Sequence, residues 1–171
     1  MATAEKYHGS VFSGADAKGR FTLPVDMRRR VRAGSGDANN LFVAPTSDLS
    51  CIIGFGEDYI TEMDQELQAD VDAARVRGET VERHSRSKEL VRDLERVTFD
   101  DGGRFALPPE MKEALEIGES VIFVGALKTF EIWQPDRFFA TGQGSEFSRI
   151  KLRKAMEEWA AKPKAARGKA S

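Results

Sequence analysis

The sequence predicts an α+β protein, mainly β, in which two copies of one small unit are joined by a helical connector and followed by a C-terminal helix. Repeats are sought first because they fix the architecture. The segments Asp16–Pro24 and Asp100–Pro108, 84 residues apart, agree in Asp, Gly, Arg, Phe, Leu and Pro at matching positions. The order of the apolar blocks that follow is also the same in both halves. We therefore expect a duplication.

The repeated segment itself is typical of a strand followed by a short helix. Phe21 and Leu23 alternate with polar or small neighbours, as residues of a half-buried strand do, and Pro24 is tolerated in the first turn of a helix. Met27 and Val31 are four residues apart, so they give this helix one apolar face. The corresponding residues of the second copy are Phe105, Leu107, Pro108, Met111 and Leu115.

Further strands and two helical segments complete the predicted architecture. Gly34 and Gly118 are expected to end the short helices. Two apolar strands then follow in each copy, near 41–44, 51–55, 121–124 and 129–133. Apolar residues at helical spacing predict a charged connector that breaks near Gly78, and a last helix whose stripe of Leu152, Met156 and Trp159 packs on the sheet or on another subunit. The resulting division is a first unit at 7–56, a connector at 57–90, a second unit at 91–137, a C-terminal helix at 146–161 and a disordered basic tail at 162–171.

Composition limits the classes of function. The 171 residues carry a net charge of −2, which argues mildly against a nucleic-acid binder, although the positions of the charges matter more than their sum. The single cysteine, Cys51, excludes an internal disulfide and a cysteine-based zinc site, and its apolar neighbours predict a core residue. The N-terminus lacks the apolar run of a signal peptide, and the apolar stretch 121–127 is far shorter than the about 20 residues that span a bilayer. We expect a soluble, cytoplasmic protein.

Sequence motifs of enzymes are missing. The two histidines, His8 and His84, lack metal-ligand spacing, and the sequence has no phosphate-binding loop, dinucleotide fingerprint or serine nucleophile elbow. The neighbouring carboxylates Asp100 and Asp101 could do acid–base work, but the repeat already explains Asp100. We expect neither an enzyme nor a bound cofactor or metal.

The Gly-Arg step within Asp-x-x-Gly-Arg-Phe-x-Leu-Pro is the most informative motif. Its glycines, Gly19 and Gly103, predict turns whose backbone would strain other residues. In one interpretation the acid and the arginine of each motif form a salt bridge that braces the turn. In the other, the arginine projects outward and reaches DNA. Both can hold, because the acid can orient the arginine.

The basic residues are concentrated in the first copy. From Lys18 to Arg32 six cations are opposed only by Asp26, a net charge of +5, whereas the matching stretch 102–116 has −1. Phosphate binding requires such a positive cluster. The run of arginines at 28–30 is either a solvated helix face or a surface for DNA, since the planar fork of arginine grips both phosphates and guanine edges.

These motifs are similar to those of the MraZ family of bacterial transcriptional regulators, whose two halves are each SpoVT-AbrB-like. The family's paired Asp-x-x-x-Arg motifs correspond to 16–20 and 100–104, its aromatic-x-Gly start to 7–9, and its Phe-Glu-Leu-Trp ending to 130–133. The resemblance covers about residues 7–160. It implies a SpoVT-AbrB-like (double-psi) swapped-hairpin fold in each half, a ring-like homo-oligomer such as an octamer or dodecamer, and double-stranded DNA as partner.

The resemblance also implies roles for individual residues. The implied DNA contacts are Lys18, Arg20, Arg28, Arg29 and Arg104, and the implied turn-forming residues are Asp16, Gly19, Asp100 and Gly103. Equal roles for the two halves are not expected, because Gly102 stands where the first motif has Lys18. The implied function is repression of the protein's own operon, the division and cell wall cluster, by binding to short direct repeats on the nucleoid. The alternative is a protein-interaction module of the antitoxin type, against which the duplicated unit and the long connector argue.

Overall fold

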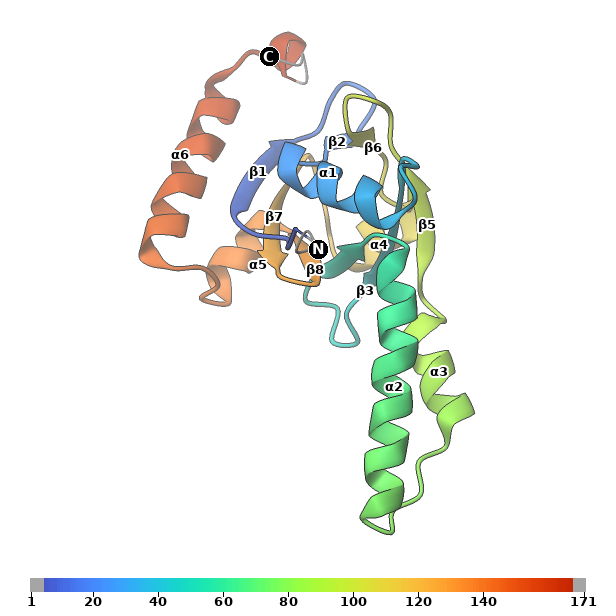
Figure 1. The fold of residues 1–171 in the computed structure, drawn as a ribbon. Coiled ribbons are helices and arrows are strands. Elements are labelled where there is room, and N and C mark those ends of the chain that lie inside the picture. The colour runs from blue at the N-terminus through green and yellow to red at the C-terminus, as the bar shows by residue number, and fades with distance from the viewer. Residues whose placement is uncertain (1–4, 168–171) are drawn as a thin grey trace.

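A computed structural model describes residues 5–167 and has an α+β architecture with a mostly antiparallel sheet (Figure 1). The strands are β1 (Ser10–Gly14), β2 (Phe21–Thr22), β3 (Asn40–Pro45), β4 (Ile52–Phe55), β5 (Glu95–Thr98), β6 (Arg104–Phe105), β7 (Ser120–Ala126) and β8 (Thr129–Trp133). The helices are α1 (Val25–Gly34), α2 (Asp58–Val76), α3 (Arg83–Val91), α4 (Pro109–Ala114), α5 (Pro135–Ala140) and α6 (Glu146–Ala161), with a 3₁₀ turn at Lys164–Ala166.

The sheet mixes strands from both halves of the chain. Its six strands lie in the order β1-β7-β8-β4-β3-β5, and β2 pairs with β6 in a separate ribbon. Strand β1 pairs with β7 of the other half, and its counterpart β5 pairs with β3, again across the halves. The sheet is therefore symmetric. The equivalent strands β1 and β5 form its two edges, β7 and β3 lie next to them, and β8 and β4 lie in the middle. Neither half could complete this sheet alone.

The core lies between the ribbon, the short helices and the sheet. Phe21 and Phe105 are fully buried and lie opposite each other in the ribbon. The ring of Phe105 meets that of Phe123 on β7 at 6.2 Å in an edge-on arrangement. Met27 and Val31 are also buried, which confirms the predicted apolar face of helix α1.

The two short helices begin as predicted but end differently. Helix α1 begins after Pro24 and α4 after Pro108, at the positions where proline is tolerated. Helix α1 ends at Gly34, as expected. The expectation that Gly118 ends α4 is wrong: this helix ends at Ala114, and Glu116 takes the left-handed backbone with φ 55°.

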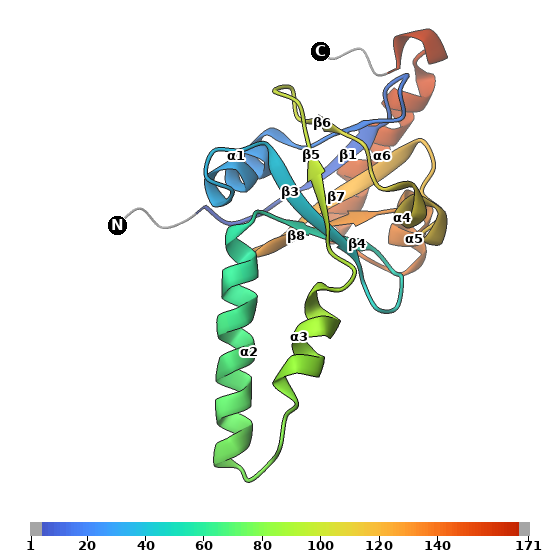
Figure 2. The same cartoon turned by 90° about the vertical axis from the view of Figure 1, so that its right-hand side faces the viewer.

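The connector forms an arm that projects from the sheet (Figures 1 and 2). We use "arm" for α2, the loop after it and α3, residues 58–91. Helix α2 ends just before Gly78, whose φ of +76° turns the chain, so the predicted break is confirmed. Leu67 and Val71 of α2 are buried, whereas α3 has no buried residue. The arm is therefore held mainly by one face of α2.

Helix α6 packs along β1, and its stripe lies on the protein's own sheet. Leu152 is buried, and the Trp159 ring meets Phe12 edge-on at 5.8 Å. The tail at 162–171 was expected to be disordered. Within its described part, residues 162–167, that expectation is wrong, because a 3₁₀ turn forms at Lys164–Ala166. Residues 168–171 lie outside the described part.

Cys51 is buried as expected, and burial raises the pKa of its thiol to about 11. Such a thiol stays protonated at neutral pH and is a poor nucleophile. Among residues 5–167, the helices are too short or too polar to cross a membrane.

Candidate nucleic-acid interface

The two Asp-x-x-Gly-Arg turns lie together at one end of the molecule. They are brought there by the ribbon, in which Phe21 pairs with Phe105 and Thr22 with Arg104. Figures 1 and 2 show both turns beyond the ribbon, with α1 beside them and the arm pointing the opposite way. We call the surface formed by turns 16–20 and 100–104 and helix α1 the motif face.

Within the first turn, Asp16 organises the backbone and also holds the arginine. Its Oδ1 accepts hydrogen bonds from the backbone N–H groups of Lys18 and Arg20, both at 2.9 Å. Its Oδ2 accepts from Arg20 Nε at 2.9 Å and pairs with Nη2 at 2.8 Å. Burial acts to raise the pKa of Asp16, but these bonds outweigh it and lower the pKa below its ordinary value. Asp16 therefore stays ionised and fixes the direction of the Arg20 side chain.

The second turn repeats this arrangement in a more exposed place. Asp100 accepts hydrogen bonds from the Arg104 backbone N–H at 2.9 Å and from Arg104 Nε at 2.7 Å. The backbone bond, followed by the side-chain pair, lowers the pKa of Asp100. Arg20 Nη1 also lies 3.9 Å from Asp100 Oδ2, so the two motifs are linked through their charges. Both arginines are thus braced by the acids of their turns, and the side chain of Arg104 is more exposed than that of Arg20.

The two motif glycines have the same backbone and different surroundings. Gly19 has φ +74° and Gly103 has φ +84°, a region that glycine enters without strain. A Cβ at Gly19 would meet nothing within 4 Å. A Cβ at Gly103 would lie 2.8 Å from Arg28 Nη1 and 3.1 Å from the Leu23 carbonyl oxygen. Only the second glycine is therefore also required for close packing.

The arginines at 28–30 of helix α1 differ in their partners and in their exposure. Arg28 donates from Nη1 to the Asp101 carbonyl oxygen at 3.3 Å, which ties α1 to the second turn. Arg29 is exposed and lies 3.4 Å from Asp26. Arg30 is buried, pairs with Asp58 at 2.8 Å and lies 5.4 Å from the Tyr7 ring centre. Because Arg30 is buried and paired with Asp58, the positive cluster at the surface is smaller than the net charge of +5 expected from the sequence.

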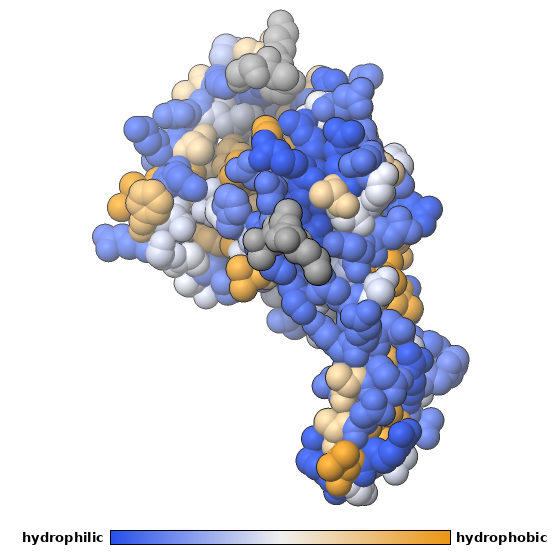
Figure 3. Space-filling model, in the orientation of Figure 1, coloured by the Kyte–Doolittle hydropathy of each residue, from blue (hydrophilic) through white to orange (hydrophobic). Residues whose placement is uncertain are grey.

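The cations that remain on the motif face are accessible. Lys18 and Arg32 are exposed, and within residues 5–167 neither side chain has an ion-pair partner. In Figure 3 the surface over α1 is mostly hydrophilic, whereas hydrophobic side chains gather on the outer side of α6 and at the free end of the arm. The motif face is thus a polar, positively charged surface, with a hollow beside the first turn.

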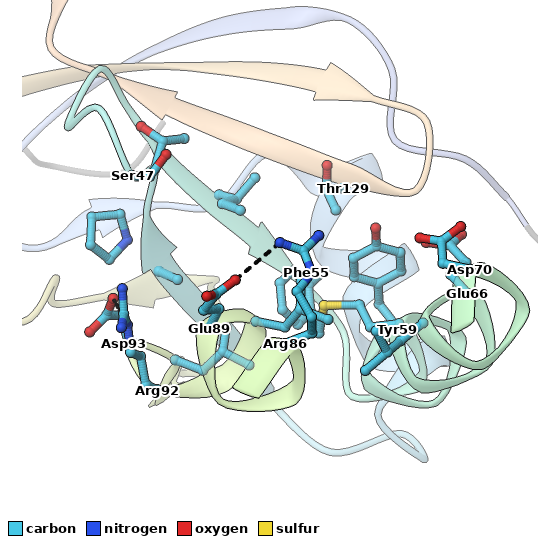
Figure 4. A pocket seen from close by; sticks show the side chains of 18 of the residues that line it. Ser47, Phe55, Tyr59, Glu66, Asp70, Arg86, Glu89, Arg92, Asp93 and Thr129 are labelled. Atoms are coloured by element: carbon cyan, nitrogen blue, oxygen red, sulfur yellow. Dashed lines mark hydrogen bonds and ion pairs between the residues drawn. The ribbon is translucent and has the colours of Figure 1, made fainter. Parts of the chain in front are cut away.

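A separate hollow lies between the arm and the sheet. It has a volume of about 640 Å³ and is lined by apolar side chains such as Phe55, Met63 and Leu90. Figure 4 shows Arg86 and Glu89, paired at 3.0 Å, reaching from α3, with Tyr59, Glu66 and Asp70 on the α2 side. Within the described residues, no group of histidine, cysteine and carboxylate side chains is placed to hold a metal ion.

Comparison with known proteins gives one consistent family. The family model described as "MraZ protein, putative antitoxin-like" matches residues 91–158, which contain the second turn. "Transcriptional regulator MraZ" of Beijerinckia indica subsp. indica is 34% identical over 123 residues, which are 72% of this chain and 70% of the relative. The protein of the same name from Gluconacetobacter diazotrophicus is 30% identical over 132 residues, 74% of this chain and 80% of the relative. That from Rhodospirillum rubrum is 27% identical over 134 residues, 78% of this chain and 83% of the relative.

The chain belongs to the MraZ family. Its relatives are named as transcriptional regulators, which is not a class of enzyme, so the chain is a transcription regulator, as expected from its motifs. In this MraZ-family chain, the candidate residues Lys18, Arg20, Arg28, Arg29 and Arg104 all lie on the motif face.

Sequence reasoning missed other residues near the same turns. Asn39 donates to Asp101 Oδ1 at 3.1 Å and so ties the start of β3 to the second turn. Lys112 lies over the Phe21 ring, 5.7 Å from its centre, and lines a hollow beside the first turn. The repeat gave a signal for Lys112, because it aligns with Arg28. No sequence signal indicated Asn39.

Proposed function

We propose that this chain is a sequence-specific DNA-binding transcriptional regulator that contacts double-stranded DNA through its motif face. The observation that carries the proposal is the meeting of two Asp-oriented arginines and a basic helix at one end of the molecule. Arg20 and Arg104 are held by carboxylates, so their guanidinium groups lose little freedom on binding. Lys18 and Arg29 are exposed and suit contacts with phosphates.

The proposed interface is asymmetric between the two turns. The first turn has Lys18 and is followed by the basic helix α1, whereas the second has Gly102 and is followed by α4 with two of the three acids of 102–116. Arg28 donates a hydrogen bond to the Asp101 carbonyl oxygen, so the first copy also adds a positive charge beside the second turn. We propose that the first turn supplies most of the affinity and that the second helps to set the orientation.

We further propose that each half is a SpoVT-AbrB-like unit of the swapped-hairpin type, spanning 7–56 and 91–137. The pairing of β1 with β7 and of β5 with β3 supports this, because each half donates its first strand to the other. Residues 57–90 then act as a connector, and 146–161 as an added helix. The implied regulatory role is repression of the protein's own operon through short direct repeats on the nucleoid, in the cytoplasm.

A homo-oligomer is part of this proposal. Phe147 and Ile150 of α6 are 74% and 61% exposed, and Val76 at the end of α2 is 87% exposed. Exposed apolar side chains that lie together on one helix, as Phe147 and Ile150 do, mark interaction surfaces, whereas a single one such as Val76 is ordinary. Several copies of the motif face on one assembly would increase avidity for repeated DNA sites without any stronger single site.

The proposal is tested by fluorescence anisotropy with DNA from upstream of the protein's own gene and with scrambled DNA, across a salt series. We expect preference for the upstream DNA and an affinity that falls steeply as salt rises, because phosphate contacts release counterions. Equal affinity for both DNAs would reduce the protein to a non-specific binder. Absence of binding at low salt would overturn the proposal.

A matched pair of variants locates the interface. Arg29 and Arg75 are both exposed arginines on helices, and each pairs with an aspartate three residues earlier, at 3.4 Å and 3.7 Å. Arg75 lies on the arm, away from the motif face. Arg29→Ala is expected to lower the affinity several-fold and Arg75→Ala to leave it unchanged. Equal losses would place the interface elsewhere.

The alternative function is a protein-interaction module of the antitoxin type. It is favoured by the apolar hollow at the base of the arm, whose rim includes Glu66, Asp70 and Asp93. Co-purification of a foreign protein in a stoichiometric amount, together with no binding to DNA, would support this alternative.

A further inference from the structure

The end of helix α6 is fixed against the strand that leads into the first motif turn. Trp159 lies directly on Gly14, where a Cβ would come 2.0 Å from the indole Nε1, so the space exists only because residue 14 is glycine. The same ring meets Phe12 of β1 edge-on. Gly14 is the last residue of β1, and Asp16 follows two residues later. Trp159 therefore places the C-terminal end of α6 beside the motif face.

Residues after α6 are folded back by Arg167. Its guanidinium lies over the Trp159 ring, 4.7 Å from the ring centre. Its Nε donates to the Lys162 carbonyl oxygen at 2.9 Å, and its Nη2 donates to the Ala160 carbonyl oxygen at 2.7 Å. These carbonyls lie at the end of a helix, where intrahelical donors run out. Arg167 thus closes residues 162–167 into a compact loop, which we call the C-terminal loop.

The C-terminal loop shares a hollow with the first motif turn. This hollow, about 420 Å³ in volume, is lined by Asp16 and Gly19 of the turn and by Lys164 and Arg167 of the loop. Lys112 and Glu119 also line it. Figure 2 shows the loop beside the β1–β2 connection, at the same end of the molecule as the ribbon. Residues separated by almost the whole chain are thus neighbours on one surface.

The charges of the loop are suited to an anionic partner. Residues 162–167 contain Lys162, Lys164 and Arg167 and no acidic residue. Lys162 and Lys164 are exposed, whereas Arg167 is held by the indole and two carbonyls. Asp16 in the same hollow is already neutralised by Arg20. Glu119 is the remaining acid among the residues that line it, against Lys112, Lys164 and Arg167.

We propose that the C-terminal loop is a second DNA-contacting element, in which Lys162 and Lys164 contact the phosphate backbone next to the site of the first turn. The inference rests on the proposed DNA-binding function and extends it beyond the residues that the family motif identifies. Arg167 and Trp159 act as the clamp that positions the loop. Because lysine contacts phosphates as a point charge, the loop adds affinity without sequence preference.

The test compares two double variants of the full chain, Lys162→Ala/Lys164→Ala and Lys151→Ala/Lys154→Ala. All four lysines are exposed, and both variants remove two positive charges. The control pair lies earlier on α6, about 12 Å (Lys154) and about 16 Å (Lys151) before Lys162 along the helix axis, at a rise of about 1.5 Å per residue. Each variant is titrated against upstream and scrambled DNA across a salt series by fluorescence anisotropy.

The loop variant is expected to lose affinity for both DNAs to the same extent. Its plot of log affinity against log salt should become shallower by about 1.8 for each subunit that contacts the DNA, from about 0.9 for each phosphate contact. The control should keep the slope of the original protein. Equal slopes for the loop variant and the control would overturn the proposal, as would a loss confined to the upstream DNA.

The two proposals can fail separately. If the original protein binds both DNAs equally well, sequence-specific regulation fails, but a shallower slope for the loop variant still supports the loop as a phosphate contact. If the original protein binds no DNA at low salt, both proposals fail. Arg167→Ala provides an independent readout: loss of the clamp should change the tryptophan fluorescence, because Trp159 loses its cationic neighbour. An unchanged spectrum and an unchanged salt slope would refute the positioning role.

Discussion

Replacing Gly103 with alanine should destabilise the protein more than the same replacement at Gly19. Both residues occupy the same position in their motifs and have left-handed φ values, +84° and +74°. A residue with a Cβ in this region costs roughly 1–2 kcal/mol, part of which is offset because alanine also restricts the unfolded chain. Around Gly19 the added Cβ meets nothing within 4 Å. We therefore expect Gly19→Ala to cost about 1 kcal/mol of unfolding free energy.

At Gly103 a steric cost is added to the backbone cost. The new Cβ would lie 2.8 Å from Arg28 Nη1, which can move, and 3.1 Å from the Leu23 carbonyl oxygen. That backbone cannot move freely, because the Leu23 N–H donates to the Gly103 carbonyl at 2.8 Å. Overpacking of this kind costs about 1–3 kcal/mol. The total for Gly103→Ala is about 2–4 kcal/mol.

Urea unfolding followed by far-ultraviolet circular dichroism measures this difference. Both variants and the original protein are compared at one protein concentration, because stability depends on concentration in an oligomer. The slopes of free energy against urea should agree, so that the midpoints report stability alone. Equal losses at the two glycines, or a larger loss at Gly19, would refute the assignment of Gly103 as a packing position.

Three other perturbations give distinct outcomes. Arg20→Ala should weaken DNA binding about tenfold, the equivalent of about 1.4 kcal/mol, and far more than Lys112→Ala; equal effects in anisotropy titrations would contradict an asymmetric interface. Asp58→Ala should lower the thermal midpoint, because it leaves the buried Arg30 without its 2.8 Å partner; an unchanged midpoint would show that this ion pair is dispensable. The folded-state pKa of Asp16 is lowered, so its contribution to stability is complete above its ordinary value of 3.8 and is lost as pH falls through the folded-state pKa. Asp16→Asn should therefore reduce the acid-induced loss measured by urea unfolding below pH 3.8, and an identical loss would refute this.

The elements near the motifs could be predicted because their causes are local. Alternation places Phe21 and Phe105 in strands, and Pro24 and Pro108 mark helix starts, since neither feature depends on distant residues. The pairing of β2 with β6 is different. It depends on a contact between Phe21 and Phe105, which are 84 positions apart. The repeat shows that these two segments are similar, but it does not show that they pair with each other.

The buried Arg30 shows what a charge count cannot resolve. Three consecutive arginines on a helix point about 100° apart, so they cannot all lie on one face. Arg30 is three residues after Met27 and next to Val31, and both of these are buried, so spacing alone gave a signal that it faces inward. Its partner Asp58 is 28 residues away and gave no such signal.

The structure also changes how the net charge of −2 should be understood. Helix α2 in the arm contains six acidic residues and one arginine, whereas the exposed cations Lys18, Arg29 and Arg32 lie at the opposite end. Apart from Asp58, which pairs with the buried Arg30, these acidic residues lie on a segment that projects away from the motif face. At physiological salt, charges separated by more than about 8 Å through solvent are largely screened from one another. A single subunit can thus present a positive surface to DNA. An oligomer would carry several copies of this surface, but the surface itself does not depend on oligomerisation.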